Sequence, residues 1–482
     1  MIARFYSLEQ FGLFNLYYTF LTIFGVIAAV GLQDGLARYI GYYTGKDEKE
    51  NIGAVIRWGL LFGLISAIFV AVGLYLISGY IAPFLAEDPD FSLYLKLVAI
   101  TIPFLVIFNI LISIFRGFQR IKENIIFSSL IQPTLILVSI IVLGLMALTF
   151  VNVLIAVSLT FMLNLVFFYV YYLRNKKYIF RGLLHGKLKL KIGKELLLFS
   201  LPLLLVGIMV EIMEFTDTIT LAYLKTEAAV GLYSAAKPLS HFILTGFTIS
   251  MFIYQPLVSN LFAKNRFKEN EAIYLSLTKW ICFITLPVAL CFVLFPKAVL
   301  SIYGTKYLIA ASTLQVFVVI YFLHNFLGPN HCTLIAYGKS NFVMYVNTLG
   351  AILNVIGNFI LIPTYGPAGA AVATGISLLS ISALKAFKMF KLSGINVFRS
   401  YIIKPIFLTS LIAVLIAIPV GRFITVNLIA LGILFILFTT ILLLIIILSK
   451  SFSKEDIELV LLVEKSTGLN FKRTKRLLRR FL

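Results

Sequence analysis

Long apolar stretches alternate with short polar segments along almost the whole chain. Each stretch is about twenty residues long, which is the length that an α-helix needs to cross the hydrocarbon core of a membrane. The stretches lack the polar face that a surface helix of a soluble protein shows. The pattern therefore predicts about thirteen membrane-spanning helices. They lie at residues 11–33, 54–79, 92–115, 125–147, 150–172, 196–223, 231–258, 275–300, 308–336, 342–362, 366–388, 401–420 and 424–448.

The composition supports an all-α polytopic membrane protein. Hydrophobic residues make up 61% of the chain and charged residues only 13%, which is too little charge to cover the surface of a soluble protein. A soluble helical solenoid is disfavoured, because its helices would each need a polar face. The three cysteines (Cys282, Cys291 and Cys332) lie in or beside apolar stretches without the spacing of metal ligands, so we interpret them as packing residues.

The charge is strongly positive, with a formal net charge of +21. Such a charge can indicate a nucleic-acid partner, but here the lysines and arginines gather in every second loop between the apolar stretches. This alternation follows the positive-inside rule. We therefore expect membrane lipids and no nucleic acid as partners. We also expect a multi-pass protein of the cell (cytoplasmic) membrane, with its basic loops and C-terminus in the cytoplasm.

Two basic segments fall outside the predicted spans. Residues 174–195 alternate Lys with Leu and Ile, and we expect them to lie on the cytoplasmic membrane face near anionic lipid. Residues 451–482 open with a helix start signal at Ser453 and Asp456 and end in a basic run that resembles an amphipathic surface helix. A solvated linker is the alternative for both segments.

The chain also contains a weak internal repeat. Residues 11–15 (FGLFN) resemble residues 230–234 (VGLYS), so that Gly12 and Gly231 correspond to each other 219 residues apart. At the same offset, the polar loop at 44–51 faces the loop at 263–270. Both copies keep their basic loops on one side, which indicates a parallel repeat related by an axis along the membrane normal, as in many transporters.

The repeat and the charge pattern together predict how the chain is organised. The predicted parts are a first lobe of five spans (1–173), a basic cytoplasmic linker (174–195), a second lobe of six spans (196–391), two additional spans (392–450) and a basic cytoplasmic tail (451–482). An odd number of spans before a cytoplasmic C-terminus places Met1 outside, and the first half holds one span fewer than the second. We therefore expect a fourteen-helix plan whose first helix is absent.

Several short motifs, in their order and spacing, resemble one family of transporters. They are residues 9–14 (EQFGLF), 31–39 (GLQDGLARY), 199–203 (FSLPL), 230–236 (VGLYSAA) and 362–374 (IPTYGPAGAAVAT). The last motif predicts a tight turn between two helices. Together they resemble the polysaccharide-transport branch, the O-antigen-type flippases, of the multidrug/oligosaccharidyl-lipid/polysaccharide exporter superfamily.

The resemblance implies a fold and a function. It implies two pseudo-symmetric helical lobes around a central cavity, and alternating access that moves a polyprenol-linked oligosaccharide across the membrane without catalysis. The implied partners are the lipid-linked oligosaccharide and the membrane enzymes of glycan assembly. The implied coupling ion, where there is one, is Na⁺ or H⁺, and no other cofactor or metal is expected.

A phosphate-bearing substrate needs cationic side chains in a water-filled cavity, because an ionised group without a partner is costly in a low-dielectric core. We predict phosphate contacts from Arg38, Arg57 and Lys237, with His241 one turn after Lys237 on the same helix face. Snorkelling to the lipid head groups is the alternative for the arginines. For Lys279 we favour snorkelling.

Three acids lie on one predicted span at successive spacings of three: Glu211, Glu214 and Asp217. We predict that they pair with Lys237 or bind the coupling cation. Hard cations prefer several oxygen ligands, and amides and a hydroxyl near the 362–374 turn would supply more. These groups are Asn354, Asn358 and Thr374. A structural charge pair with an acid at the outer interface is the alternative for Asp217.

Three other functions stay open. A multidrug/cation antiporter of the same fold would favour an acidic, aromatic-lined cavity. A membrane-embedded glycan enzyme would need acidic groups in a sizeable loop or extramembrane domain, and the only acidic cluster in the short outer loops is at 87–90. An inactive scaffold would bind other envelope-assembly proteins through the basic tail.

Overall fold

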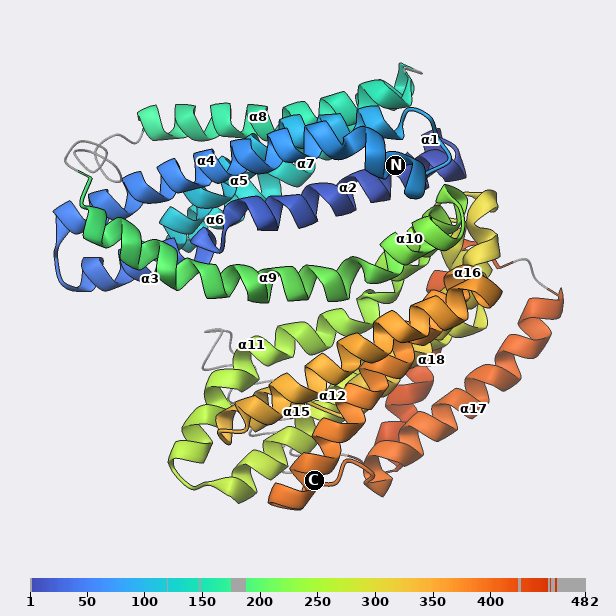
Figure 1. Ribbon diagram of the computed structural model, residues 1–482. Coiled ribbons are helices and arrows are strands. Elements are labelled where there is room, and N and C mark those ends of the chain that lie inside the picture. The colour runs from blue at the N-terminus through green and yellow to red at the C-terminus, as the bar shows by residue number, and fades with distance from the viewer. Residues whose placement is uncertain are drawn as a thin grey trace. The chain divides into compact units, whose positions relative to one another are not determined.

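The computed structural model describes residues 2–118, 120–146, 149–174, 188–423 and 426–449, together with Ser451 and Asp456. All regular structure in these ranges is helical (Figure 1). The predicted all-α membrane fold is confirmed, because eleven helices within the ranges are long and apolar enough to cross a membrane. Most of the predicted linker (174–195) and tail (451–482) lies outside the described residues.

The chain divides into two compact units, Met1–Gly231 and Leu232–Leu482. The helices of the first unit are α1 (Ile2–Phe5), α2 (Leu8–Ala29), α3 (Leu32–Gly45), α4 (Lys49–Ile81), the 3-10 turn η1 (Ala82–Phe84), α5 (Phe91–Gly117), α6 (Ile121–Asn124), the π-helix η2 (Ile125–Ile131), α7 (Gln132–Leu145), α8 (Phe150–Arg174) and α9 (Leu190–Leu224).

The second unit contains the remaining helices. α10 (Glu227–Ser240) begins in the first unit and continues into the second. The others are α11 (Phe242–Ala263), α12 (Phe267–Leu294), α13 (Pro296–Leu300), the 3-10 turn η3 (Thr305–Ala310), α14 (Ala311–Phe326), α15 (Asn330–Ala336), α16 (Ser340–Ser393), α17 (Ser400–Phe423) and α18 (Leu428–Leu448).

The helix α9 packs along α2, α3 and α4 within the first unit (Figure 1). The compact units therefore divide after α9, at Gly231, whereas the sequence places the lobe division before this helix, at residues 174–195. Small residues make the close packing of α9 on α3 feasible, since Gly35 faces Ser200 without a side chain between them. The predicted lobe boundaries stay a prediction.

The repeat positions Gly12 and Gly231 lie against each other in the first unit. A Cβ atom at Gly12 would collide with the carbonyl group of Glu227, and a Cβ at Gly231 would collide with the carbonyl of Leu8. Leu8 and Glu227 are also 219 residues apart. Each repeat copy therefore contacts the other through the same two positions, as expected of a contact on a two-fold axis.

The motif at 362–374 forms the tight turn that the sequence predicts. α16 is 54 residues long and is broken at Gly366, where φ is 53° and ψ is −131°, a backbone conformation that glycine adopts without strain. Hydrogen bonds join the two halves of α16 from Gly350 to Ser377 and from Asn347 to Lys385, so the halves run antiparallel. α16 therefore accounts for two predicted spans, 342–362 and 366–388.

The predicted span at 231–258 has a different form. α10 and α11 meet there at His241, and neither is counted among the eleven long apolar helices, although Phe242–Met251 is a shorter apolar segment. With this pair and the two halves of α16, each predicted span has a helical counterpart. The counts of eleven and about thirteen differ because helices are broken or joined at these two places.

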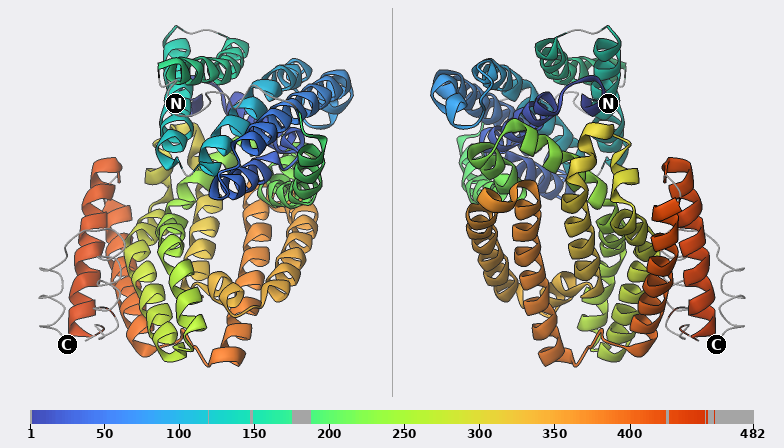
Figure 2. Two further views of the ribbon diagram at one scale, coloured as in Figure 1. Left: turned by 90° about the vertical axis from the view of Figure 1, so that its left-hand side faces the viewer. Right: turned by 90° about the vertical axis from the view of Figure 1, so that its right-hand side faces the viewer.

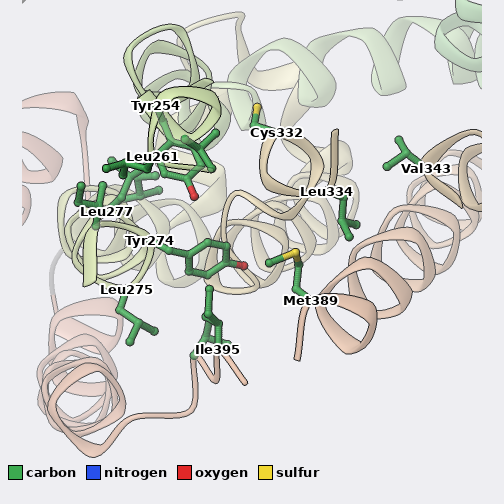
Figure 3. Close-up of a cluster of buried hydrophobic side chains, with 14 residues drawn as sticks. Tyr254, Leu261, Tyr274, Leu275, Leu277, Cys332, Leu334, Val343, Met389 and Ile395 are labelled. Atoms are coloured by element: carbon green, nitrogen blue, oxygen red, sulfur yellow. The ribbon is translucent and has the colours of Figure 1, made fainter. Parts of the chain in front are cut away.

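Two apolar clusters hold the second unit together. One joins α12 to α17 and α18 through Phe283, Ala413, Phe438 and other buried residues, and α17 and α18 lie side by side in both views of Figure 2. The other joins α11, α12, α15 and α16, with Tyr274 lying near Met389 (Figure 3). The two C-terminal spans are thus packed onto the second unit through α12.

Candidate functional site

A pocket of about 560 Å³ opens in the first unit where α3, the start of α4 and the start of α9 meet. We call it the Arg38 pocket. It is lined by Arg38, Tyr39, Tyr42, Tyr43, Lys46, Glu48, Asn51, Lys189, Lys191, Ile192 and Glu195. Its volume is in the range of small-molecule sites, about 300–1,000 Å³. It lies at the end of the unit that the charge pattern predicts to be cytoplasmic.

The spacing of residues on α3 builds one wall of this pocket. Arg38, Tyr39, Tyr42, Tyr43 and Lys46 fall at positions that share one side of an α-helix. The rings of Tyr39 and Tyr43 stack with centroids 6.2 Å apart, and those of Tyr42 and Tyr43 pack edge to face at 5.2 Å. The α3 wall therefore presents aromatic surface beside two cations.

The opposite wall comes from the beginning of α9. The Trp58 indole N–H on α4 donates to the Lys189 carbonyl at 3.0 Å. The Lys189 ammonium donates to Asn51 Oδ1 at 2.7 Å and pairs with Glu50 at 3.1 Å. The Tyr39 hydroxyl reaches the Glu195 carbonyl at 3.5 Å. These contacts fix the start of α9 against α3 and α4 and keep the pocket open between them.

The cations of the pocket are held against aromatic rings. The Arg38 guanidinium carbon lies 4.0 Å from the centroid of the Phe199 ring, and Lys46 Nζ lies 4.4 Å from that of Tyr42. The hydrogen bond with the Tyr42 hydroxyl raises the pKa of Lys46 above its ordinary value, so Lys46 stays charged at neutral pH. Four cations and two carboxylates line the pocket, which favours an anionic ligand.

The structure separates the other predicted phosphate contacts from Arg38. Arg57 lies on α4 and does not line the Arg38 pocket. Lys237 and His241 belong to the second unit. Lys237 Nζ lies 5.7 Å from the centroid of the Tyr233 ring, and His241 Nε2 lies 3.3 Å from the Tyr321 hydroxyl. That these three residues contact phosphate stays a prediction.

The predicted coupling-cation residues form two separate groups. Asn354 donates to Thr374 Oγ1 and accepts from Asn358, both at 3.3 Å, inside the α16 hairpin of the second unit. The three acids lie on α9 of the first unit, where Asp217 is buried, Glu211 is half-buried and Glu214 is exposed. Among the described residues, no three His, Cys, Asp or Glu side chains converge on a metal site. Cation binding stays a prediction.

Sequence reasoning missed several polar groups that the structure defines. The tyrosines of the Arg38 pocket are among them, although their i, i+3, i+4 spacing at 39, 42 and 43 would have signalled a shared face. Lys385 was assigned to a basic loop, yet it is buried in α16 and donates to Asn347 Oδ1 at 2.8 Å. No local signal indicates that burial.

The snorkelling expected of Lys279 is wrong. Its side chain is 1% exposed, and its ammonium lies 2.6 Å from Asp456 Oδ2, which is equally buried. Asp456 Oδ1 also accepts hydrogen bonds from Ser276 at 2.5 Å and from the Trp280 indole at 2.8 Å, and Lys279 donates to the Ser451 carbonyl at 3.0 Å. Lys279 therefore has a structural partner and anchors the residues after α18 to α12.

Comparison with protein families gives two matches. The model of a family described as polysaccharide biosynthesis protein matches residues 1–262, more than half of the chain. A model described as MatE matches residues 202–360. An uncharacterized membrane protein of Methanocaldococcus jannaschii is 25% identical over 396 residues, which cover 75% of this chain and 74% of that protein.

Solved structures share the fold. A structure of the lipid II flippase MurJ in an inward closed conformation superposes with a TM-score of 0.68 at 16% identity, covering 92% of this chain and 93% of that one. An inward-facing multidrug resistance MATE family transporter of the MOP superfamily superposes with a TM-score of 0.66 at 16% identity, covering 81% and 92%. At this identity the likeness concerns the fold alone, and it is the two-lobed fold that the sequence predicts.

Proposed function

The chain belongs to the polysaccharide biosynthesis protein family, and we propose that it is an alternating-access flippase that carries a polyprenol-linked oligosaccharide across the cytoplasmic membrane. The observation that carries this proposal is the Arg38 pocket. It combines cations with aromatic rings in a volume of about 560 Å³, at the end of the first unit where a precursor made in the cytoplasm would enter.

The lining of the pocket matches the chemistry of such a head group, which carries phosphate beside sugar. The guanidinium of Arg38 is suited to paired hydrogen bonds with phosphate oxygens. Tyrosine offers an apolar ring face together with a hydroxyl group, and three tyrosines line the pocket. A charged head group leaving water gains here the partners that a low-dielectric core withholds.

The residues predicted elsewhere have later roles in this proposal. Lys237 and His241 in the second unit receive the phosphates as the substrate passes. The oxygen-bearing side chains bind the coupling ion, Na⁺ or H⁺: Glu211, Glu214, Asp217, Asn354, Asn358 and Thr374. Neutralising Glu211 and Glu214 by substitution with Gln would then abolish the dependence of transport on an ion gradient, and unchanged dependence in both variants would reject the coupling role.

A multidrug/cation antiporter is the second candidate. It is favoured by the MatE model match at residues 202–360 and by the likeness to a MATE transporter fold. The acids on α9 would serve a cationic substrate. The surplus of cations over carboxylates in the Arg38 pocket favours the flippase.

Transport in vesicles separates the two candidates. The purified full chain is reconstituted into liposomes, and two substrates are followed in parallel: a fluorescent polyprenyl diphosphate-linked disaccharide and a fluorescent lipophilic cation. We expect translocation of the lipid-linked sugar above the protein-free rate and no gradient-driven movement of the cation. Movement of the cation alone would overturn the proposal in favour of the antiporter.

A further inference from the structure

A second cavity lies in the second unit, at the end that carries the basic residues of the α16–α17 connection. It has a volume of about 360 Å³, and we call it the Phe387 pocket. It is lined by Tyr274, Leu327, Asn330, Ala383, Ala386, Phe387, Phe390, Ile395, Asn396, Val397 and Phe398. None of these residues belongs to the Arg38 pocket or to the predicted coupling site.

The floor of the Phe387 pocket is a break between two helices. α14 ends at Phe326 and α15 begins at Asn330, with Gly328 between them at a φ of 81°. The Tyr274 hydroxyl lies 2.9 Å from the Leu327 carbonyl and 2.7 Å from Asn330 Oδ1, and the Asn330 amide donates to the same carbonyl at 2.7 Å. The break is thus closed by its own hydrogen bonds, as non-helical backbone at membrane depth requires.

The walls of the pocket are apolar. Ala383 and Ala386 leave room along α16, and Phe387, Phe390 and Phe398 stand beside that room with 57%, 52% and 63% of their surface exposed. The segment after α16 folds back, because Ile395 and Val397 are buried in the apolar cluster of α11, α12, α15 and α16. The Ile395 side chain lies below Tyr274 in Figure 3. The lining residues carry no formal charge.

Cations flank the mouth of this apolar space. Lys391 Nζ lies 4.6 Å from the centroid of the Phe387 ring, one of the lining residues. Arg399 follows the lining residue Phe398 and lies 3.4 Å from Glu271. The site therefore combines a hydrocarbon-like interior with an adjacent positive charge, at the side of the membrane that the loop charges predict to be cytoplasmic.

We infer that the Phe387 pocket binds one acyl chain of an anionic phospholipid from the cytoplasmic leaflet, with the lipid phosphate at Lys391. A volume of 360 Å³ holds about a dozen groups of the size of water or a methylene, which is most of one acyl chain. Moving a chain from the bilayer into an apolar pocket exchanges one apolar surrounding for another. The cation at the mouth therefore decides which lipid binds. This inference does not rest on the proposed transport activity.

Photolabelling of the full chain in liposomes tests the inference. The probe is phosphatidylglycerol with a diazirine near the end of one acyl chain, and phosphatidylcholine with the same chain is the comparison. We expect the phosphatidylglycerol probe to label peptides within 383–398 about fivefold more than the phosphatidylcholine probe, which is the effect of one lysine near an anionic head group. Equal labelling by both probes would overturn the inference.

Two variants and two matched controls locate the binding. Ala386→Trp fills the pocket, and Lys391→Gln removes the charge at its mouth; each should lower labelling by phosphatidylglycerol severalfold. Ile360→Trp changes an exposed position of the same helix, and Lys404→Gln removes an exposed charge on α17; both should label as the wild type does. Unchanged labelling in Lys391→Gln overturns the inference even where Ala386→Trp fails to fold.

The competitor identifies the source of the chain. Unlabelled phosphatidylglycerol should reduce labelling, and polyprenyl phosphate at the same concentration should not. Stronger displacement by polyprenyl phosphate would overturn the phospholipid assignment and make the pocket a substrate site. The labelling is measured without transport, so its failure leaves the flippase proposal to its own assay.

Discussion

At the scale of single residues, the sequence identifies cations better than it identifies their partners. Arg38 was singled out because a cation beside an apolar stretch needs a reason to be there, and it lines the largest described pocket of the first unit. The ring of Phe199 beneath it, 161 positions away in the chain, could not be predicted, because that contact depends on how α9 packs against α3.

Lys279 shows the same limit more sharply. From the sequence it is one lysine near the start of an apolar stretch, for which snorkelling is the simplest interpretation. Its partner, Asp456, is 177 residues away. Only the packing of the chain after α18 onto α12 brings the two charges together, and no local pattern encodes that packing.

The buried pair yields a stability prediction. Lys279→Met leaves Asp456 charged and buried without its partner, and should destabilise the second unit by about 3–5 kcal/mol. The double variant Lys279→Met/Asp456→Leu removes both charges and should recover most of this loss. Thermal unfolding of the detergent-purified chain measures both effects. A double variant no more stable than the single one would show that the pair does not act as a unit.

At the scale of elements, spans follow from apolar length, and breaks follow only where the sequence punctuates them. The turn in α16 was predictable because Pro363, Gly366 and Pro367 interrupt the apolar pattern. Gly328 and Pro329 carry a similar signal, which the long apolar span at 308–336 concealed. The junction of α10 and α11 at His241 has no such signal, since Phe242 and the residues after it continue the apolar stretch.

The contact between α2 and α10 gives a prediction for helix packing. Gly12→Ala and Gly231→Ala each place a Cβ atom against a backbone carbonyl, and overpacking of this kind costs about 1–3 kcal/mol. Because the contact is reciprocal, the two variants should lower the unfolding temperature by similar amounts. Gly73→Ala, where a Cβ meets open space, is the control and should change little. A clear inequality between Gly12→Ala and Gly231→Ala would argue against a symmetric contact.

At the scale of the whole molecule, the internal repeat was the most informative sequence feature. Two stretches 219 residues apart predicted a two-fold relationship, and their equivalent glycines meet. The division between lobes was harder to place, because α9 carries the second-half motif at 199–203 yet packs within the first unit. Periodicity and charge reveal that a helix crosses the membrane, but they do not reveal which neighbours it chooses.

The predicted orientation can be measured by cysteine labelling in intact cells. Lys49→Cys lies in a basic loop and should react with a membrane-impermeant maleimide only after the cells are opened. Asp90→Cys lies in the acidic loop and should react in intact cells. The native cysteines are all buried, so the background is low. The reverse labelling pattern would reject the cytoplasmic placement of the basic loops and of the Arg38 pocket.

The central claim is that the Arg38 pocket holds the phosphate-bearing head group of a lipid-linked oligosaccharide, and one measurement tests it directly. The rate at which reconstituted protein translocates a polyprenyl diphosphate-linked disaccharide is compared between the wild type, Arg38→Gln and the surface control Lys404→Gln. Loss of a charge-assisted hydrogen bond of about 1.5–3 kcal/mol predicts a rate at least about tenfold lower for Arg38→Gln and a wild-type rate for Lys404→Gln. A correctly folded Arg38→Gln variant that transports at the wild-type rate would contradict the claim.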